Sequence, residues 1–500
     1  MDEIIKKLTA YKPFHALVIG DYMLDQYIRG AAERLSPDAP VPVLKAEQTE
    51  DRPGGAANVC LDIVALGGKV TVLGVAGDDT EGQLLRKAME KAGCDTRGLI
   101  VDPDRPTTVK RSLIGLAQHR HPQKMFRVDI ESSEAISPSV LQEMLKVYEQ
   151  ILPEVDIVCI EDYNKGVCSA LLCREIMQRA RAMGKQVLVD PAAVDDYGRY
   201  HGATAITPNR SEAELATGMD TVEDAGDAEN EELASMLLHT LDLDAVILTL
   251  DRSGALVLER DGSAVPVATV AREVYDVTGA GDMVLAALAA ARSQGWDWRD
   301  SVVFANVAAG LEVAVFGVEP IPLVNVKREL LTQHHPLPGK VRTLEELLIE
   351  LDVHRQSGKS IVLTNGCFDV IHAGHVAYLR EAKNQGDILV VGVNSDEQVT
   401  IQKGAGRPVY NINDRLEILS ELQCVDYLIE FNEPTAHELL RNIKPHIYIK
   451  GGDYRPEDIN EWDLLKEWIA EGRIELKVLA HRPGLGSTQT IEKLNNAGNK

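Results

Sequence analysis

Two unrelated strand–turn–helix motifs on one chain most constrain how this sequence can fold. The first runs Asp276-Val277-Thr278-Gly279-Ala280-Gly281-Asp282 and opens an apolar helix, while the second places a His-x-Gly-His directly after an apolar strand, between Thr364 and His375. Glycine-rich turns of this kind hold backbone N–H groups at the edge of a parallel sheet. With 500 residues the chain is too long for one core, because single cores stop growing at about 250–300 residues. The sequence therefore predicts two α/β domains.

The first region alternates short β-rich runs with helical patterns. Its apolar runs are 16–19, 70–73, 157–160, 187–189 and 245–249. Such alternation predicts a mainly parallel sheet with helices on both faces. The segments 41–44 and 108–114 predict extra strands that form a small β flap.

A second alternation begins after a short polar, proline-containing stretch. A helix is expected at 344–356, followed by strands at 361–363, 388–393, 427–429 and 447–450. This pattern predicts a smaller Rossmann-like α/β domain. We place the first domain at residues 1–332, the linker at 333–342 and the second domain at 343–500, since proline and polar residues are typical of domain linkers.

Charge and composition exclude several functions. The net charge of −25 repels nucleic acid and anionic membranes, and an aromatic content of 5% is low for a surface that stacks on bases. The longest apolar stretch, 302–318, is interrupted by Asn306 and Glu312 and is too short to span a bilayer. Seven scattered cysteines, without a C-x-x-C pair, and the absence of a secretory pattern at the amino terminus predict a reduced, cytoplasmic protein.

The first motif has the chemistry of a phosphoryl-transfer site. Gly279, Ala280 and Gly281 would direct backbone N–H groups, reinforced by the helix dipole, at an anionic group. Asp282, one turn into the helix, would take a proton from an attacking hydroxyl. A glycine-rich turn with no function is the alternative for this motif taken alone.

Other polar residues that follow strands favour the functional interpretation. Asp21 and Asp25 follow the first strand, where carboxylates could accept sugar hydroxyls. A turn suited to a polyol contains Gly54, Gly55 and Asn58. Asn209 and Glu212 form an N-x-x-E pair able to position water around Mg²⁺.

In this order, these segments resemble the ribokinase-type sugar kinases of the PfkB family over residues 10–320. The resemblance implies that Asp282 is the base, that residues 279–281 form the anion hole, and that ATP and Mg²⁺ are used. It also implies a nucleotide-side loop containing Thr249, Asp251 and Gly254, with Asn306 nearby. A homodimer formed through this domain is expected.

The second motif provides donors for a different phosphate. His372 and His375 lie three residues apart at the start of a helix expected at 376–384, and Gly374 leaves space for a close phosphate. Two imidazoles at a helix N-terminus would stabilise charge on an α-phosphate under attack. A zinc site is the alternative, but the sequence offers no third ligand with suitable spacing.

The whole stretch G-x-F-D-x-x-H-x-G-H resembles the cytidylyltransferase-like nucleotidyltransferases. The likeness implies that cations needed at the triphosphate and the sugar phosphate come from Lys403, Arg407 and Arg415. It implies further nucleotide contacts from Phe368, Asp369 and Gly374, from Asn394, from Lys450, Gly451 and Asp453, and from Ser487 and Thr488. The arginine that the family places after its Ser-Thr pair is missing, and Lys493 is the candidate to replace it.

The two domains in this order resemble bifunctional enzymes that pair a heptose 7-phosphate kinase with a heptose 1-phosphate adenylyltransferase. That family makes ADP-heptose for the lipopolysaccharide core, so the resemblance implies sugar phosphates and ATP as substrates. Residue chemistry alone reaches only a sugar kinase joined to a nucleotidyltransferase. The alternative is a kinase with a cytidylyltransferase that acts on another sugar or polyol phosphate.

Overall fold

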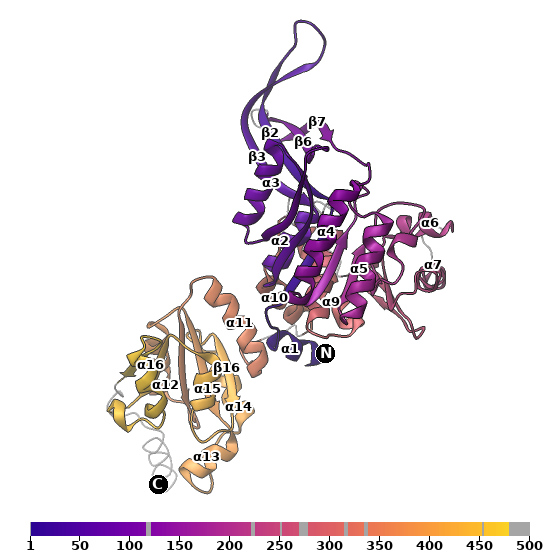
Figure 1. The fold of residues 1–500 in the computed structure, drawn as a ribbon. Coiled ribbons are helices and arrows are strands. Elements are labelled where there is room, and N and C mark those ends of the chain that lie inside the picture. Colours follow the sequence, from indigo (N-terminus) through magenta and orange to yellow (C-terminus); the bar gives the residue numbers. More distant parts are fainter. Residues whose placement is uncertain are drawn as a thin grey trace, which may run out of the picture. The chain divides into compact units, whose positions relative to one another are not determined.

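The computed structural model describes residues 2–116, 122–221, 226–250, 253–269, 279–314, 319–334, 339–452 and 455–479. By its internal contacts the chain forms two compact units. The first unit is Tyr11–Val326, and the second unit combines Met1–Ala10 with Lys327–Lys500. Figure 1 shows each unit built around its own sheet.

The first unit contains a nine-stranded sheet in the order β13-β12-β11-β10-β9-β8-β1-β4-β5. Its strands are β1 (His15–Gly20), β4 (Lys69–Gly77), β5 (Asp95–Asp102), β8 (Ile157–Glu161), β9 (Gln186–Asp190), β10 (Ala205–Ile206), β11 (Ala245–Thr249), β12 (Ala255–Glu259) and β13 (Ala264–Val267). Pairing is parallel from β11 to β5, and β12 and β13 add an antiparallel edge. The chain proceeds in one direction from β1 to β5 and in the other from β8 to β11. The strand order therefore reverses between β1 and β8, where ligands bind in sheets of this type.

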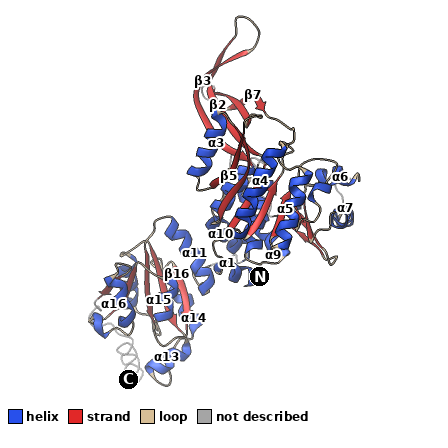
Figure 2. Cartoon of the chain, viewed as in Figure 1, coloured by secondary structure: helices blue, strands red, loops and turns tan. Residues whose placement is uncertain are grey.

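Helices cover both faces of this sheet (Figure 2). One face packs against α4 (Pro138–Ile151), α5 (Ala170–Ala182) and α7 (Asp227–Thr240), whose apolar side chains share one core with those of the strands. Helices α2 (Ala56–Ala65), α8 (Ala280–Ser293) and α9 (Trp298–Glu312) pack together on the other face. The other helical elements are α3 (Thr80–Lys91), η1 (Leu152–Glu154), η2 (Gly198–Tyr200), α6 (Arg210–Thr217) and α10 (Leu323–His334), of which α10 begins in this unit and ends in the second.

A second, four-stranded sheet forms the flap. Its order is β3-β2-β6-β7, from β2 (Tyr22–Leu35), β3 (Pro42–Gly55), β6 (Thr108–Leu116) and β7 (Gln123–Ile130). The segments predicted at 41–44 and 108–114 lie almost wholly within β3 and β6. The strands β2 and β3 are longer than expected and extend from the unit as a two-stranded arm (Figure 1).

One buried carboxylate in this unit is not compensated by the helices around it. Asp62 of α2 is fully buried, and neither carboxylate oxygen has a hydrogen-bond partner among the described residues. Burial, followed by the negative charges of Glu312 and Asp282, raises the pKa of Asp62 well above its usual value. The folded state therefore favours the protonated carboxyl, and this contribution to stability is lost as the pH rises through the folded-state pKa.

We expect Asp62→Asn to stabilise the protein at pH 8 by about 1–3 kcal/mol, because a neutral amide avoids the cost of either protonating this carboxyl or burying its charge on folding. Thermal unfolding at pH 5 and pH 8 measures this gain, which should shrink at the lower pH. Asp102→Asn is the matched control, since Asp102 is also buried but Oδ1 accepts a hydrogen bond from the Asp104 amide. A variant Asp62→Asn that is less stable than wild type at pH 8 would contradict the assignment.

The second unit contains a five-stranded parallel sheet in the order β16-β15-β14-β17-β18. Its strands are β14 (Ile361–Gly366), β15 (Ile388–Asn394), β16 (Tyr427–Phe431), β17 (Ile447–Gly451) and β18 (Glu475–Leu479). Its helices are α1 (Asp2–Thr9), α11 (Leu344–Gln356), α12 (Ala373–Lys383), α13 (Asp396–Lys403), α14 (Ile412–Ser420), α15 (His437–Ile443), η4 (Pro456–Asp458) and α16 (Trp462–Ala470). The strand order reverses between β14 and β17, so the carboxyl ends of these two strands form the expected ligand site.

The amino-terminal helix belongs to this second unit. In α1, the side chains of Ile4, Ile5 and Leu8 are buried, and the helix packs against α11. The polypeptide therefore passes between the units twice, after Ala10 and after Val326. The predicted boundaries at 332 and 343 stay a prediction.

Separate expression tests these boundaries. We expect residues 1–332 and 343–500 to give two folded pieces, because each sheet has its own core. A second piece to which residues 1–10 are fused should unfold at a higher temperature than 343–500 alone, since α1 covers apolar side chains. Insolubility of both pieces beside a soluble full-length protein would mean that the boundary is misplaced.

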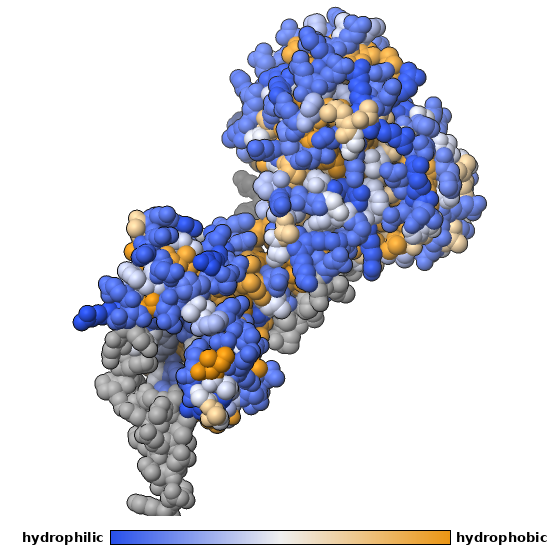
Figure 3. Space-filling model, turned by 60° about the horizontal axis from the view of Figure 1, so that its bottom comes forward, coloured by the Kyte–Doolittle hydropathy of each residue, from blue (hydrophilic) through white to orange (hydrophobic). Residues whose placement is uncertain are grey.

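The surface is mainly polar on the face drawn in Figure 3, where apolar side chains occur as small separate groups. No helix within the described ranges has the length and apolar character needed to cross a membrane. All seven cysteines are free thiols, five of them buried. The cytoplasmic location stays a prediction.

Candidate active sites

The first site lies at the carboxyl ends of β1, β8 and β9, beside the N-terminus of α8. Asp282 is its central residue and is 4% exposed. Its Oδ1 accepts a hydrogen bond from the Tyr163 hydroxyl at 2.9 Å, and its Oδ2 accepts one from Nδ2 of Asn58 at 2.9 Å. Burial raises the pKa of Asp282 to about 6, against the lowering effect of these two bonds and of Lys110. The two hydrogen bonds thus fix the orientation of the carboxylate.

The predicted anion hole is the first turn of α8. Gly279 is the N-cap residue and has φ 93°, a left-handed conformation that favours glycine. A Cβ atom on Gly281 would lie 3.3 Å from Oδ2 of Asp190, so a side chain there would crowd the site. Asp276, Val277 and Thr278 lie outside the described residues.

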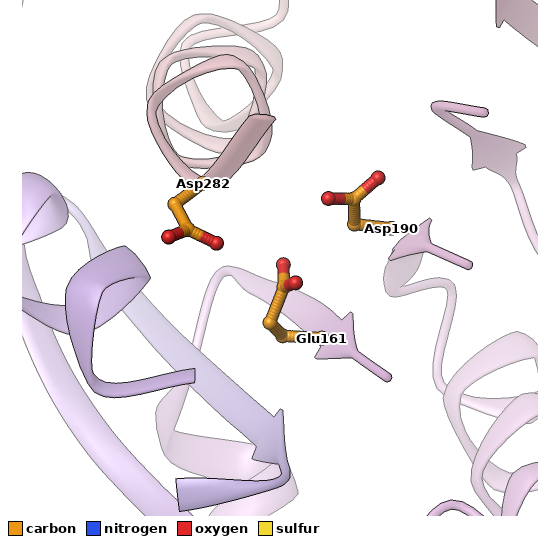
Figure 4. Close-up of side chains that lie close together, drawn as sticks. All are labelled: Glu161, Asp190 and Asp282. Carbon is orange, nitrogen blue, oxygen red and sulfur yellow. The ribbon is translucent and has the colours of Figure 1, made fainter. Parts of the chain in front are cut away.

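Two further carboxylates accompany Asp282, and the sequence analysis missed both. Glu161 ends β8, and Asp190 ends β9. One oxygen from each of the three residues lies within 4.8 Å of the other two, and Figure 4 shows the three groups pointing toward one another. Both residues directly follow predicted apolar strands, and this position was the available signal because ligand sites form at the carboxyl ends of parallel strands.

The predicted sugar side contains Asp25, Gly54 and Gly55, where β2 meets β3. A Cβ on Gly54 would lie 2.4 Å from Oδ2 of Asp25. Glycine at position 54 therefore lets the Asp25 carboxylate lie against the backbone of that residue. Burial raises the pKa of Asp25, and the charges of Lys110, Arg127 and Lys124 oppose this effect. These flap cations were not predicted, and they give the site positive charge for an anionic sugar.

Asp21 has a different setting from Asp25. Its carboxylate accepts backbone N–H groups of Tyr163, Lys165 and Val167, at 2.9, 3.0 and 3.4 Å. The side chain is buried, and burial raises its pKa to about 6. In this structure Asp21 holds the loop after β8, and with it Tyr163, while its contact to a sugar stays a prediction.

The predicted magnesium residues form the start of α6. Asn209 and Glu212 make a capping box, in which Oδ1 of Asn209 accepts the Glu212 amide and Oε2 of Glu212 accepts the Asn209 amide, both at 2.9 Å. Burial raises the pKa of Glu212. Burial also raises the pKa of Asp190, and the charge of Glu212 adds to this effect. The cap uses Oε2 of Glu212, so the other carboxylate oxygen can accept a hydrogen bond from a metal-bound water.

Of the predicted nucleotide-side residues, Thr249 lies beside the start of this helix. Thr249 forms a parallel bridge with Asn209, and Gly254 has φ 94°, which favours glycine. Nδ2 of Asn306 donates to the Val267 carbonyl at 3.0 Å. Asp251 lies outside the described residues, and the role of this group stays a prediction.

The second site is at the N-terminus of α12, after β14. His372 caps the helix: its Nδ1 accepts the Gly374 amide at 3.1 Å, and the His372 amide donates to Nδ1 of His375 at 3.4 Å. The two imidazole rings lie 4.1 Å apart. Phe368, with φ 46°, lies 5.5 Å from the ring of His375. The two rings and the N-terminus of α12 thus place hydrogen-bond donors in one small region, where they can stabilise negative charge on a phosphate.

Two arginines predicted to bind substrate are engaged within the protein. Arg407 pairs with the buried carboxylate of Asp369, whose Oδ1 also accepts the Val409 amide. Arg415 is fully buried and donates to the Cys367 carbonyl at 2.5 Å and to Asp396 at 2.6 Å. These bonds position the loop after β14, and direct contacts to substrate by Asp369 and both arginines stay predictions.

Of the remaining predicted residues, Asn394, Lys450 and Gly451 lie at the ends of β15 and β17. Asn394 ends β15 and is buried, whereas Lys403, at the end of α13, is exposed. Nζ of Lys450 donates to Oδ1 of Asn365 at 2.9 Å, and a Cβ on Gly451 would meet the Tyr378 ring at 2.8 Å. Asp453, Ser487, Thr488 and Lys493 lie outside the described residues.

Comparisons with known proteins give a family for each of the two parts of the chain. The family of pfkB carbohydrate kinases matches residues 14–323, and the cytidylyltransferase-like family matches residues 363–493. The bifunctional protein HldE of Geobacter metallireducens is 39% identical over 491 residues, which cover 98% of each chain. The HldE protein of Shewanella piezotolerans is 39% identical over 488 residues, covering 97% of this chain and 98% of that protein. The crystal structure of Escherichia coli phosphofructokinase-2 with potassium shares the fold at a TM-score of 0.52 and 15% identity, over 65% of this chain and 99% of that one.

Fold and family matches define an enzyme in which a carbohydrate kinase is joined to a nucleotidyltransferase. The predicted fold, a ribokinase-like domain followed by a Rossmann-like domain, is confirmed. With this identity over nearly its whole length, the chain belongs to the family of bifunctional HldE proteins. It is therefore an enzyme of ADP-heptose synthesis, as its resemblance to the heptose kinase and adenylyltransferase family implied.

Proposed function

We propose that the first unit transfers the γ-phosphoryl group of ATP to the anomeric hydroxyl of D-glycero-β-D-manno-heptose 7-phosphate. Asp282 takes the proton of that hydroxyl, and the hydrogen bonds from Tyr163 and Asn58 hold its carboxylate in place. The backbone amides of Gly279, Ala280 and Gly281 bind the phosphoryl oxygens. Asp25 and the turn at Gly54 and Gly55 orient the sugar.

Magnesium is the cofactor that we assign to this reaction, with Asn209 and Glu212 holding its water ligands. When bound, Mg²⁺ neutralises charge on the phosphate oxygens of ATP. The chain itself contributes the rigid cap of α6, which fixes both side chains. Lys110 lies with its Nζ 5.2 Å from the centroid of the Tyr163 ring and adds positive charge near Asp25 and Asp282.

The second unit, we propose, transfers AMP from ATP to heptose 1-phosphate. An oxygen of the sugar phosphate attacks the α-phosphorus, the bond to the β-phosphate oxygen breaks, and pyrophosphate leaves. His372 and His375 donate to the charge that builds on the α-phosphate, at the N-terminus of α12. Lys403 and Lys450 supply further positive charge at the two ends of the nucleotide.

Two features on one chain related to HldE carry this proposal. One is a buried carboxylate, held by two hydrogen bonds, in the first turn of a glycine-capped helix, and the other is a pair of imidazole rings 4.1 Å apart at the start of a second helix. The test is an ATP-consumption assay with a panel of sugar phosphates, repeated with ATP or CTP for the transfer step. We expect heptose 7-phosphate and heptose 1-phosphate with ATP to give the highest kcat/KM. Preference for CTP and another polyol phosphate would favour the alternative.

We also propose that the protein is a homodimer formed through the flap. The flap strand β7 leaves Phe126, Val128 and Ile130 exposed, and Phe126 is 67% exposed. As an edge strand with apolar side chains, β7 is suited to pairing with a second copy. Light scattering should give the mass of two chains for wild type and of one chain for Phe126→Asp. Leu171→Asp, at an exposed leucine of α5, is the control and should remain a dimer.

A further inference from the structure

A buried carboxylate in the second unit is paired with one of the proposed nucleotide contacts. Glu461 is the N-cap residue of α16, but its side chain makes no hydrogen bond that caps this helix. Its Oε1 accepts the backbone amide of Ala436 at 2.8 Å, and its Oε2 lies 3.5 Å from Nζ of Lys450. The carboxylate thus serves two other elements, the start of α15 and the end of β17.

The ammonium group of Lys450 is also held by a second residue. Its Nζ donates a hydrogen bond to Oδ1 of Asn365 at 2.9 Å, and the Tyr448 hydroxyl donates to the same oxygen at 2.8 Å. Asn365 and Lys450 lie near the carboxyl ends of β14 and β17, the adjacent parallel strands between which the strand order reverses. Two residues from different elements therefore fix one cation where sheets of this type bind ligands.

Exposure separates the roles of the two partners in this ion pair. The side chain of Lys450 is 20% exposed, whereas that of Glu461 is 1% exposed. A ligand at the strand ends can therefore reach the ammonium group but not the carboxylate. Burying a carboxylate costs free energy, which a nearby cation and hydrogen bonds must compensate. Glu461 can thus act on a ligand only through Lys450.

The charge of Lys450 depends on the same carboxylate. Burial lowers the pKa of Lys450, and the interactions with Glu461 and then with Cys367 oppose this effect. Only the protonated side chain offers a positive charge and three N–H donors. Burial, followed by the charge of Glu461, raises the pKa of Tyr448 well above its usual value, so its hydroxyl remains a donor to Asn365.

We propose that Glu461, together with Asn365, is a positioning residue for adenylyl transfer, which holds the ammonium group of Lys450 in place as a charged donor to the nucleotide. This inference rests on the proposed function of the second unit, in which Lys450 supplies positive charge to the nucleotide. Glu461 itself touches no substrate. It lies outside both sequence motifs, so its role follows from these contacts alone.

The test measures pyrophosphate release by the full-length protein and the KM for the nucleoside triphosphate that wild type uses, which is ATP by the proposed function. Glu461→Gln keeps the size of the side chain and can still accept the Ala436 amide. We expect its KM to rise about tenfold with little change in kcat, because a contact made in the ground state and the transition state alike is weakened. The alkaline limb of kcat/KM should move down by about 1 pH unit, since Lys450 loses its proton more readily without the carboxylate.

A double-mutant cycle distinguishes positioning from a purely structural role. Lys450→Met should raise the KM by itself, and adding Glu461→Gln to it should have no further effect. Glu346→Gln is the matched control and should keep the wild-type KM and pH profile, since Glu346 is also buried in the second unit and its Oε2 also accepts a backbone amide, from Thr343 at 2.8 Å. If Glu461→Gln did not fold, Asn365→Ala, which removes the other partner of Nζ at a half-buried position, should give the same rise in KM.

The outcomes separate this inference from the function on which it rests. Wild-type KM and pH profile in Glu461→Gln, beside a raised KM in Lys450→Met, would overturn the role of Glu461 and leave the proposed function standing. An equal effect of Glu461→Gln in the presence and absence of Lys450 would also overturn it, because the carboxylate would then act on the fold. A wild-type KM in Lys450→Met would instead refute the proposed nucleotide contact.

Discussion

Replacing Asp282 by Asn is expected to lower kcat/KM of the kinase reaction by about 10²- to 10⁴-fold, the usual contribution of a positioned general base. The amide keeps the size of the carboxylate and can still accept from Asn58 or Tyr163, so the fold should remain. Adenylyl transfer by the same protein should be unchanged, because His372 and His375 belong to the other unit. Coupled assays of ADP and of pyrophosphate release measure the two reactions separately.

His375→Ala is the reciprocal variant and should reverse the pattern. Loss of a donor to the transition state typically costs about 10²- to 10³-fold in rate. Kinase activity should persist, and circular dichroism should show intact secondary structure in both variants. If either change silenced both reactions in folded protein, the two sites would not be independent.

A second large effect is expected in the full reaction sequence. The kinase product is a heptose 1,7-bisphosphate, whereas the transferase that we propose accepts a sugar with phosphate at position 1 alone. The sequence contains the D-x-D pairs 102–104 and 242–244, but Asp102 is tied to the Asp104 amide and Asp242 pairs with Arg260 at 3.0 Å. Both carboxylates of the second pair bind Arg260, and we interpret the two pairs as chance spacings in an acidic chain.

Purified protein with ATP, Mg²⁺ and heptose 7-phosphate should therefore accumulate the bisphosphate. ADP-heptose should form only after a phosphatase that removes the 7-phosphate is added, and mass spectrometry follows each species. Heptose 1-phosphate, supplied directly, should give ADP-heptose without any phosphatase. Efficient conversion of the 7-phosphate by the protein alone would contradict the assignment of the second substrate.

Local signals allowed much of the fold to be predicted. The helix expected at 344–356 has those bounds in the structure, because Thr343 and Glu346 form a capping box. The helix expected at 376–384 begins earlier, at Ala373, because His372 caps it, and histidine is not a usual cap residue. Parallel strands were found because their buried runs are short and apolar.

The sites were predicted less completely, because long-range pairs leave no local pattern. Arg407 and Arg415 were expected to face substrate, yet their partners Asp369 and Asp396 lie in the loop after β14 and at the start of α13. Tyr163 touches the proposed base from a residue 119 positions away. Glu161 and Asp190 could have been found from their positions at strand ends, but the acidic residues of a chain with net charge −25 are too numerous to single out.

The helix α1 alters how this protein should be handled. Its eight residues precede the kinase in sequence but pack with the transferase, so the amino terminus is an outlying part of the second enzyme. An affinity tag or a truncation at that end should disturb adenylyl transfer before phosphorylation. Dividing the gene into two single-function enzymes would likewise require a new cover for α11, so the fused arrangement is more than two domains placed in tandem.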